Sequence, residues 1–358
     1  MSNELLFIGG FLIFIVLILA LDLGLFSKKD HVVSLKQAGI MSFVMVLLAL
    51  GFYFLLVLEG QELHGIKSMT HLEQVVKAHQ HQINLVPRNF EASIKIYNQN
   101  LGIEFLTGYV IEYALSVDNI FVIVLIFSAF SVPEKYYHRV LFWGILGAII
   151  MRFIFIFAGA ALINQFSWIL YVFGAFLIFT GLKMFFSKDG DDKIDTEKHP
   201  VVKFASRFFA IHPKYEGHNF FHRANGKRLI TPLFLVLLIV EFTDLIFAVD
   251  SIPAIFAVTK DAYIVFFSNI FAIMGLRSMF FLLVNIIHKF HYLKTGLAFL
   301  LTFIGIKMLA HHYLKLWGFT TEHSLLIILF ILTASIVASL VFPKKIKRKP
   351  EEVESLRQ

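Results

Sequence analysis

Nine apolar stretches of about 20 residues constrain the fold of this chain more than any other feature. A helix of that length crosses about 30 Å of hydrocarbon, and such a run with few charges is typical of a membrane-spanning helix. Of the 358 residues, 58% are hydrophobic and 16% are charged, which excludes a soluble domain. The sequence therefore predicts an all-α polytopic membrane protein with about nine transmembrane helices. The predicted spans are residues 5–26, 37–58, 104–130, 140–163, 166–186, 230–258, 263–287, 293–313 and 323–342.

Lysine and arginine residues predict the orientation in the membrane. With the N-terminus outside, the inner segments hold 22 of these bases and the outer segments hold six. Cytoplasmic loops carry the excess of basic residues, so the C-terminus is expected inside. The predicted divisions are 1–58 (two transmembrane helices), 59–103 (an extracytoplasmic segment with short helices), 104–186 (a first transmembrane repeat), 187–229 (a cytoplasmic loop), 230–315 (a second repeat) and 316–358 (a last transmembrane helix and a basic cytoplasmic tail).

Two of the spans contain several acidic residues each and are versions of each other. The segment 112–119 aligns with 244–251, so that Glu112 matches Asp244 and Asp118 matches Asp250. The segment 181–184, Gly-Leu-Lys-Met, recurs at 305–308 as Gly-Ile-Lys-Met, and Arg152 and Arg277 follow their acidic helices at similar distances. Three spans form each unit, and because three is odd the second unit is expected to be inverted. Inverted repeats place a transport site near the midplane between them.

Carboxylates inside a membrane cost roughly 2.5 to 3.5 kcal/mol each on the mildest scales and mark functional sites. Asp118 and Asp250 lie about 240° around the helix from Glu112 and Asp244, so a straight helix does not bring the two levels together. Pro253 is expected to break the helix near Asp250 and to aim that side chain toward the repeat interface.

The acidic spans offer oxygen ligands for a hard divalent cation such as Mn²⁺, Ca²⁺ or Mg²⁺. The chain has no cysteine, which excludes a thiolate site. Candidate metal ligands are Glu112, Asp118, Asn119, Glu241, Asp244, Asp250 and Ser251. Candidate charge partners are Asp22, Arg152, Arg277, Lys183 and Lys307. A second interpretation is that the charges form structural ion pairs, for instance Arg152 with Glu112 or Arg277 with Asp244, and that Lys183 and Lys307 extend to the membrane surface.

The segment 59–103 is expected to form two short surface helices. Thr70 to Glu73 has a capping-box pattern, and an apolar stripe follows from Phe90 to Leu101. Four histidines of this segment are interpreted as solvated, although histidines also bind metals or sense pH. They are His64, His71, His79 and His81. The acidic residues of the 187–229 loop lack the spacing of a calcium-binding EF-hand and are interpreted as solvated.

Several motifs resemble one family closely. They are residues 21–24 (LDLG), 116–119 (SVDN), 138–144 (HRVLFWG), 247–256 (FAVDSIPAIF) and 268–272 (SNIFA). Over nearly all spans the chain resembles the TerC family of bacterial integral membrane proteins, including the Alx-type manganese exporters. The resemblance implies a fold like that of the LysE superfamily, the bacterial inner membrane, and divalent cation export, best supported for manganese, with links to tellurite resistance and alkaline pH. It carries ligand roles onto Glu112, Asp118, Glu241, Asp244 and Asp250.

We therefore expect a divalent metal cation exporter, for Mn²⁺, that works by alternating access with proton coupling. Transport of Ca²⁺ or another divalent cation stays open, as does a membrane scaffold or stress-response protein with structural buried charges. The expected partners are the lipid bilayer, divalent cations and protons, with no nucleic acid and no permanently bound cofactor. No nucleotide-binding loop or catalytic triad is visible in the sequence, so an enzyme is not expected.

Overall fold

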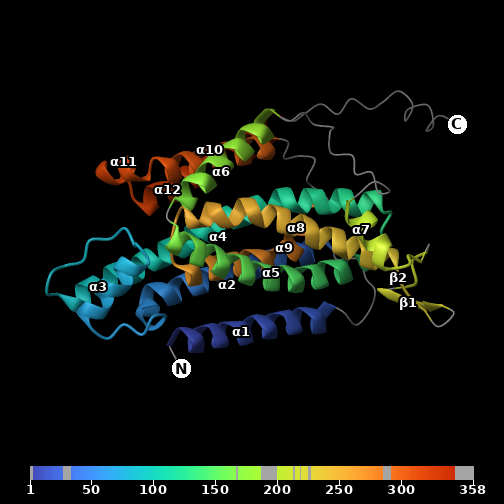
Figure 1. Cartoon of the computed structure of the whole chain (residues 1–358), viewed down its shortest axis with the longest axis horizontal. Helices are drawn as coiled ribbons and strands as arrows, with labels where there is room; N and C mark the ends of the chain where they lie inside the picture. The colour runs from blue at the N-terminus through green and yellow to red at the C-terminus, as the bar shows by residue number, and fades with distance from the viewer. Residues whose placement is uncertain are drawn as a thin grey trace.

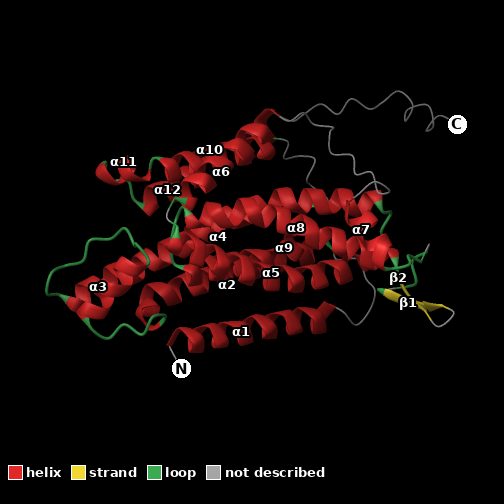
Figure 2. Ribbon diagram, in the orientation of Figure 1, coloured by secondary structure: helices red, strands yellow, loops and turns green. Residues whose placement is uncertain are grey.

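Helices make up most of the structure and run side by side in an elongated bundle (Figures 1 and 2). The computed structural model describes residues 3–26, 34–166, 168–186, 200–212, 214–217, 219–224, 227–284 and 292–342. The acidic part of the 187–229 loop and the basic C-terminal tail lie outside these residues. The α-helices are α1 (Asn3–Phe26), α2 (Leu35–Glu59), α3 (Met69–Ala78), α4 (Phe90–Ala129), α5 (Tyr137–Gln165), α6 (Ile169–Phe186), α7 (Pro200–Phe208), α8 (Pro232–Phe256), α9 (Ala262–Leu283), α10 (Leu293–Leu309), α11 (His311–Leu316) and α12 (Thr321–Val341).

Short elements connect the long helices. Two 3-10 helices, η1 (Gly60–Glu62) and η2 (Glu134–Tyr136), precede α3 and α5. Strands β1 (Phe221–Ala224) and β2 (Lys227–Ile230) pair in an antiparallel hairpin, with Phe221 opposite Ile230. Figure 1 places α3 at one end of the bundle and this hairpin at the other.

Each of the nine predicted spans coincides with a helix, which confirms the all-α polytopic class. Among the described residues, seven segments are long and apolar enough to cross a membrane. The other two are α10, with 17 residues, and α1, whose described apolar part is Phe7–Leu19. The count of nine spans therefore stays a prediction.

The outer segment differs from its prediction in two ways. Helix α3 begins after Ser68, whose side chain accepts a hydrogen bond from the His71 amide, so Thr70 is not the cap. The apolar stripe that starts at Phe90 is not a separate short helix but the first turns of α4, which has 40 residues. At 1.5 Å per residue α4 is about 60 Å long, roughly twice the hydrocarbon thickness. Nothing in its sequence stops the helix between the surface part and the membrane part.

Helix α8 continues through Pro253, so the expected break beside Asp250 is absent. The missing amide of Pro253 removes only one hydrogen bond, and the helix ends at Phe256, within one turn. That hydrogen bond would be to the carbonyl of Val249, and the helix continues without it. Asp250 therefore reaches its surroundings from a regular helix.

Helix α9 is the core of the bundle, because nearly all of its side chains are buried. It packs against α2, α4 and α5, while α6 pairs most extensively with α10. Figure 1 shows α6, α10 and α12 as a layer beside α4 and α8. The acidic helices α4 and α8 thus lie between the buried α9 and the α6–α10 pair.

Candidate functional site

A buried arginine connects the two acidic helices. Nη1 of Arg152, on α5, donates to Oε1 of Glu112 and, over 2.6 Å, to Oδ1 of Asn269. Nη2 and Nε of the same side chain donate to the two carboxylate oxygens of Asp244 over 3.1 and 3.3 Å. Asn119 donates to Oδ1 of Asp244 over 2.8 Å, and Asn269 to Oε2 of Glu112 over 3.0 Å. These five residues, from α4, α5, α8 and α9, are called the Arg152 network below.

The Arg152 network is closed to solvent. Arg152 and Glu112 are each about 1% exposed, and a buried charge is tolerated only when it is paired and hydrogen-bonded. The predicted structural pair of Arg152 with Glu112 is present. The other suggested pair differs, because the guanidinium that binds Asp244 belongs to Arg152 and not to Arg277. The carboxylate oxygens of Glu112 and Asp244 therefore already accept hydrogen bonds from donors of the protein.

Asp118 and Asp250 line a separate cavity between α4, α6, α8 and α10. The cavity has a volume of about 270 Å³, and its other polar lining residues are Thr180, Lys183 and Lys294. Oγ1 of Thr180 donates to Oδ1 of Asp250 over 3.2 Å. Both aspartates are half-buried, whereas Lys183 is exposed at the end of α6. The cavity therefore joins the matching acids of the two similar segments.

The predicted ligand set accordingly falls into two levels along α4 and α8. Glu112, Asn119 and Asp244 belong to the Arg152 network, and Asp118 and Asp250 belong to the cavity. Glu241 faces α5, where its carboxylate occupies the space that a side chain at residue 147 would fill.

The remaining predicted residues have separate surroundings. Ser251 is buried and its hydroxyl has no hydrogen-bond partner among the described residues. Arg277 is buried on α9. Lys307 is buried too and interacts with the charge of Glu104, so it does not extend to the surface as predicted. The side chain of Asp22 lies outside the described residues.

Sequence reasoning missed three polar members of these sites. Asn269 lies in the 268–272 motif, so the family resemblance was its signal in the sequence. Thr180 precedes the repeated Gly-Leu-Lys-Met motif, and Lys294 lies at the start of the predicted span 293–313. Their roles depend on helix packing, which the local sequence does not encode.

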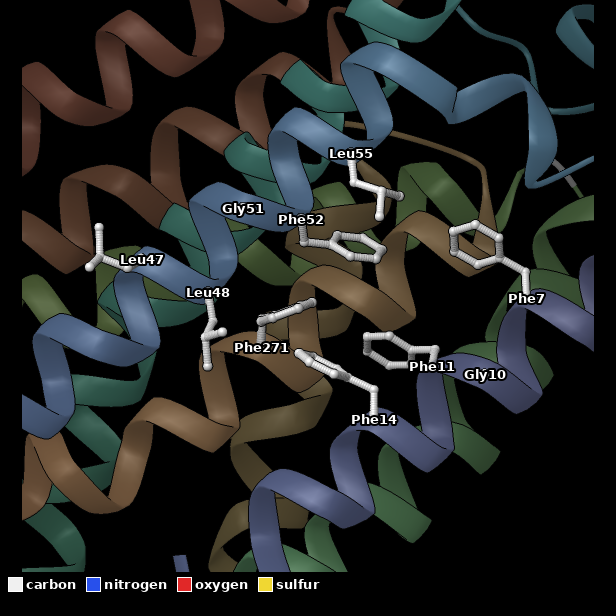
Figure 3. A pocket seen from close by; sticks show the side chains of 10 residues that line it. All are labelled: Phe7, Gly10, Phe11, Phe14, Leu47, Leu48, Gly51, Phe52, Leu55 and Phe271. Atoms are coloured by element: carbon white, nitrogen blue, oxygen red, sulfur yellow. The ribbon is translucent and has the colours of Figure 1, made fainter. Parts of the chain in front are cut away.

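A larger cavity of about 470 Å³ between α1, α2 and α9 is lined by phenylalanine, leucine and glycine. Figure 3 shows Phe11 and Phe14 of α1 facing Phe52 and Phe271 across it. It offers no oxygen or nitrogen side chain to a cation. The acid-lined cavity, although smaller, is therefore the candidate cation site.

Several histidines are not solvated as the sequence suggested. At the α3 end, His64 and His81 are buried, and their ring nitrogens lie 2.9 Å from Asp261 and 3.0 Å from Glu104. Burial lowers the pKa of His81, but the charge of Glu104 and its hydrogen bond outweigh burial, so that pKa is raised above its usual value. Burial raises the pKa of Asp261, but the charge and hydrogen bond of His64 outweigh it and hold that pKa below its usual range.

These features define a polytopic α-helical membrane protein in which paired acids from two similar segments meet inside the bundle. The model of the integral membrane protein TerC family matches residues 97–347. The chain belongs to the TerC family, as the resemblance of its motifs predicted.

Curated relatives cover most of the chain. An uncharacterized membrane protein of Myxococcus xanthus, STKORF319, is 45% identical over 333 residues, 93% of this chain and 91% of its own length. A protein of Salmonella typhi named "Putative membrane-bound redox modulator Alx" is 44% identical over 307 residues, 84% of each chain. An uncharacterized membrane protein of Rickettsia bellii is 40% identical over 328 residues, 90% of this chain and 93% of its own. No solved structure matches the chain.

Proposed function

We propose that the chain exports a divalent cation, Mn²⁺, across the bacterial inner membrane by alternating access. One observation carries the proposal: Asp118 of α4 and Asp250 of α8 line the same cavity. Two half-buried carboxylates on the wall of one cavity attract cations into it. The cavity is therefore suited to a positively charged cargo.

The ligand chemistry of the cavity favours a hard cation. Asp118, Asp250 and Thr180 offer carboxylate and hydroxyl oxygens, which suit Mn²⁺, Mg²⁺ and Ca²⁺ better than soft metals. Lys183 and Lys294 share the cavity, so an arriving cation competes with two ammonium groups for the aspartates. This competition weakens binding enough for release, which a carrier requires.

The packing of α6 against α10 supports an inverted repeat. In the aligned segments Gly174 corresponds to Ala298 and Gly181 to Gly305. A methyl group on Gly305 would lie 2.6 Å from the carbonyl oxygen of Gly174, and one on Gly181 would lie 2.8 Å from that of Ala298. The two close contacts exchange when the repeats are exchanged, which is the pattern expected of a pseudo-twofold axis between them.

The Arg152 network acts in this proposal as the closed barrier between the cavity and the α3 end. Along α4, Glu104, Glu112 and Asp118 follow one another with rises of about 12 and 9 Å. Glu112 is the middle one of these three acids, and the Arg152 guanidinium pairs with its carboxylate. Exchange of these hydrogen bonds as the repeats move would open the path in the other direction.

Protons are proposed as the coupling ion. When the cation leaves, Asp118 and Asp250 lose its positive charge, which favours proton uptake by the carboxylates. In vesicles held at zero membrane potential, a pH gradient should therefore change the rate of Mn²⁺ movement. A rate that does not change with the pH gradient would contradict proton coupling but not Mn²⁺ export.

The second candidate is a membrane scaffold with structural charges, and the Arg152 network favours it for Glu112 and Asp244. Cellular metal content separates the two functions. Cells that make the protein should hold less manganese under manganese load than cells without it, and Asp118→Asn and Asp250→Asn should abolish the difference at unchanged protein abundance. Glu322→Gln, an exposed acid on α12, is the control. Equal manganese in all strains would contradict export.

A further inference from the structure

Three side chains form a cluster in which each offers one ligand atom to a metal. Two of them flank α3, and the third lies in the connection between α8 and α9. His64 follows η1, His79 is the residue after α3, and Asp261 precedes α9. One ligand atom from each lies within 4.8 Å of the others. The distances include 2.9 Å between Nε2 of His64 and Oδ2 of Asp261, and 4.7 Å between the ring centres of His64 and His79. These three residues are called the outer triad below.

The carboxylate of the outer triad is fixed and fully buried. Oδ1 of Asp261 accepts a hydrogen bond from the Tyr263 amide over 2.9 Å, which leaves Oδ2 directed at His64. The Asp261 amide donates to the Thr259 hydroxyl, which donates over 2.6 Å to Glu104. A carboxylate without solvent costs several kcal/mol unless a cation or donors compensate it. This framework holds one oxygen beside two imidazoles, as metal sites require.

A fourth imidazole adds independent support. His81 is buried, and its ring centre lies 5.9 Å from that of His79. Its Nδ1 faces Glu104, while its Nε2 has no hydrogen-bond partner among the described residues. Buried polar atoms without a partner are rare, and an absent ion is one of their ordinary explanations. This end of the molecule therefore holds a buried imidazole nitrogen that no hydrogen bond among the described residues uses.

We propose that the outer triad binds a divalent first-row transition metal and prefers Zn²⁺ to Mn²⁺. Two imidazoles and one carboxylate suit borderline cations, unlike the all-oxygen cavity of Asp118 and Asp250. Ligand atoms around a tetrahedral zinc lie about 3.3 Å apart, given bonds of about 2.0 Å. His79 is partly exposed at the end of α3, so its ring can move the short distance that closes the site.

Metal binding would connect the outer segment to the transport helices. His64 and His79 flank α3, whereas Asp261 begins α9, the buried core helix. The bound ion would hold the outer segment against the α8–α9 connection. This site is independent of the proposed transport, because it shares no residue with the cavity.

Cobalt is the probe for the test, since bound Co²⁺ absorbs visible light according to its ligands. Full-length protein, purified in detergent and stripped with a chelator, should bind Co²⁺ with an imidazole-type spectrum, and Zn²⁺ should displace it. His79→Gln should weaken Co²⁺ binding by about 10- to 100-fold or more. The matched control is His71→Gln, in the same segment but outside the triad. His212→Gln removes the other histidine group, with Glu216 and His222 at the hairpin end, and should leave this spectrum intact.

A second readout keeps the test independent of folding and of transport. Zn²⁺ should raise the melting temperature of the wild type and of His71→Gln but not of His79→Gln, because a ligand stabilises only the state it binds. Asp250→Asn should lose Mn²⁺ movement and retain the Co²⁺ spectrum. Wild-type Co²⁺ affinity in folded His79→Gln, or no Co²⁺ binding by the wild type, would overturn the proposal.

Discussion

Two acidic residues on one helix have different surroundings in this protein. Glu112 and Asp118 are six positions apart on α4, yet Glu112 is sealed by Arg152 and Asp118 lines a cavity. The angular offset predicted that a straight helix would not bring the two side chains together, but both were expected as ligands of one metal site. It did not predict which level would be closed, since that depends on the place where Arg152 of α5 meets both acidic helices.

Arg152→Gln should destabilise the protein strongly. The change leaves the carboxylates of Glu112 and Asp244 buried without their cation, and breaking a buried ion pair costs about 3 to 5 kcal/mol. We expect low abundance in the membrane and a lower melting temperature in detergent. Arg223→Gln, at an exposed position of β1, should change neither. An Arg152→Gln protein as stable as the wild type would show that the network does not hold the helices together.

At the scale of elements, the helices were largely predictable and their ends were not. Apolar runs of about 20 residues placed each long helix, because the membrane requires that length. The join between the surface and membrane parts of α4 was missed, since neither part carries a stop signal. The effect of Pro253 was overestimated, because α8 stays helical through the proline to Phe256.

The α6–α10 pair depends on glycines, so Gly305→Ala should separate the two helices. The added methyl group would lie 2.6 Å from the Gly174 carbonyl oxygen and 2.9 Å from the Ile178 amide, and neither backbone atom can move alone. Overpacking of this kind costs about 1 to 3 kcal/mol. Because α6 carries Thr180 and α10 carries Lys294, the cavity should change and Mn²⁺ transport should fall.

A glycine with free space provides the control for this prediction. Gly39, in α2, has no atom within 4 Å of an added methyl group. Gly39→Ala should therefore keep transport and leave the melting temperature equal or slightly higher. Equal melting temperatures and equal transport for the Gly305 and Gly39 variants would contradict the close packing of α6 on α10.

At the scale of the whole molecule, the predicted topology is testable directly because the chain has no cysteine. Glu73→Cys on α3 and Arg223→Cys on β1 each introduce a single thiol at an exposed position. Helices α4, α5 and α6 separate the two positions, so they should lie on opposite sides. A membrane-impermeant maleimide should label Glu73→Cys in intact cells and Arg223→Cys only after permeabilisation. Labelling of both in intact cells would contradict three spans between them, and the reversed pattern would invert the orientation.

The whole-molecule arrangement was only partly accessible from the sequence. The duplicated acids predicted that Asp118 and Asp250 belong together, and the cavity they share agrees with that. The outer triad was not predicted, because His64 and Asp261 are 197 positions apart and meet only in the folded chain. Its histidines lie in a polar segment, where solvated side chains are the usual interpretation.

Manganese movement into proteoliposomes tests the central claim most directly. Purified wild-type protein should move Mn²⁺, and Asp118→Asn and Asp250→Asn should each reduce the initial rate at least about tenfold, which corresponds to about 1.4 kcal/mol of activation free energy. Glu322→Gln should retain the wild-type rate, and all variants should elute as the same folded species. Wild-type rates in both folded aspartate variants would contradict a cation site between Asp118 and Asp250.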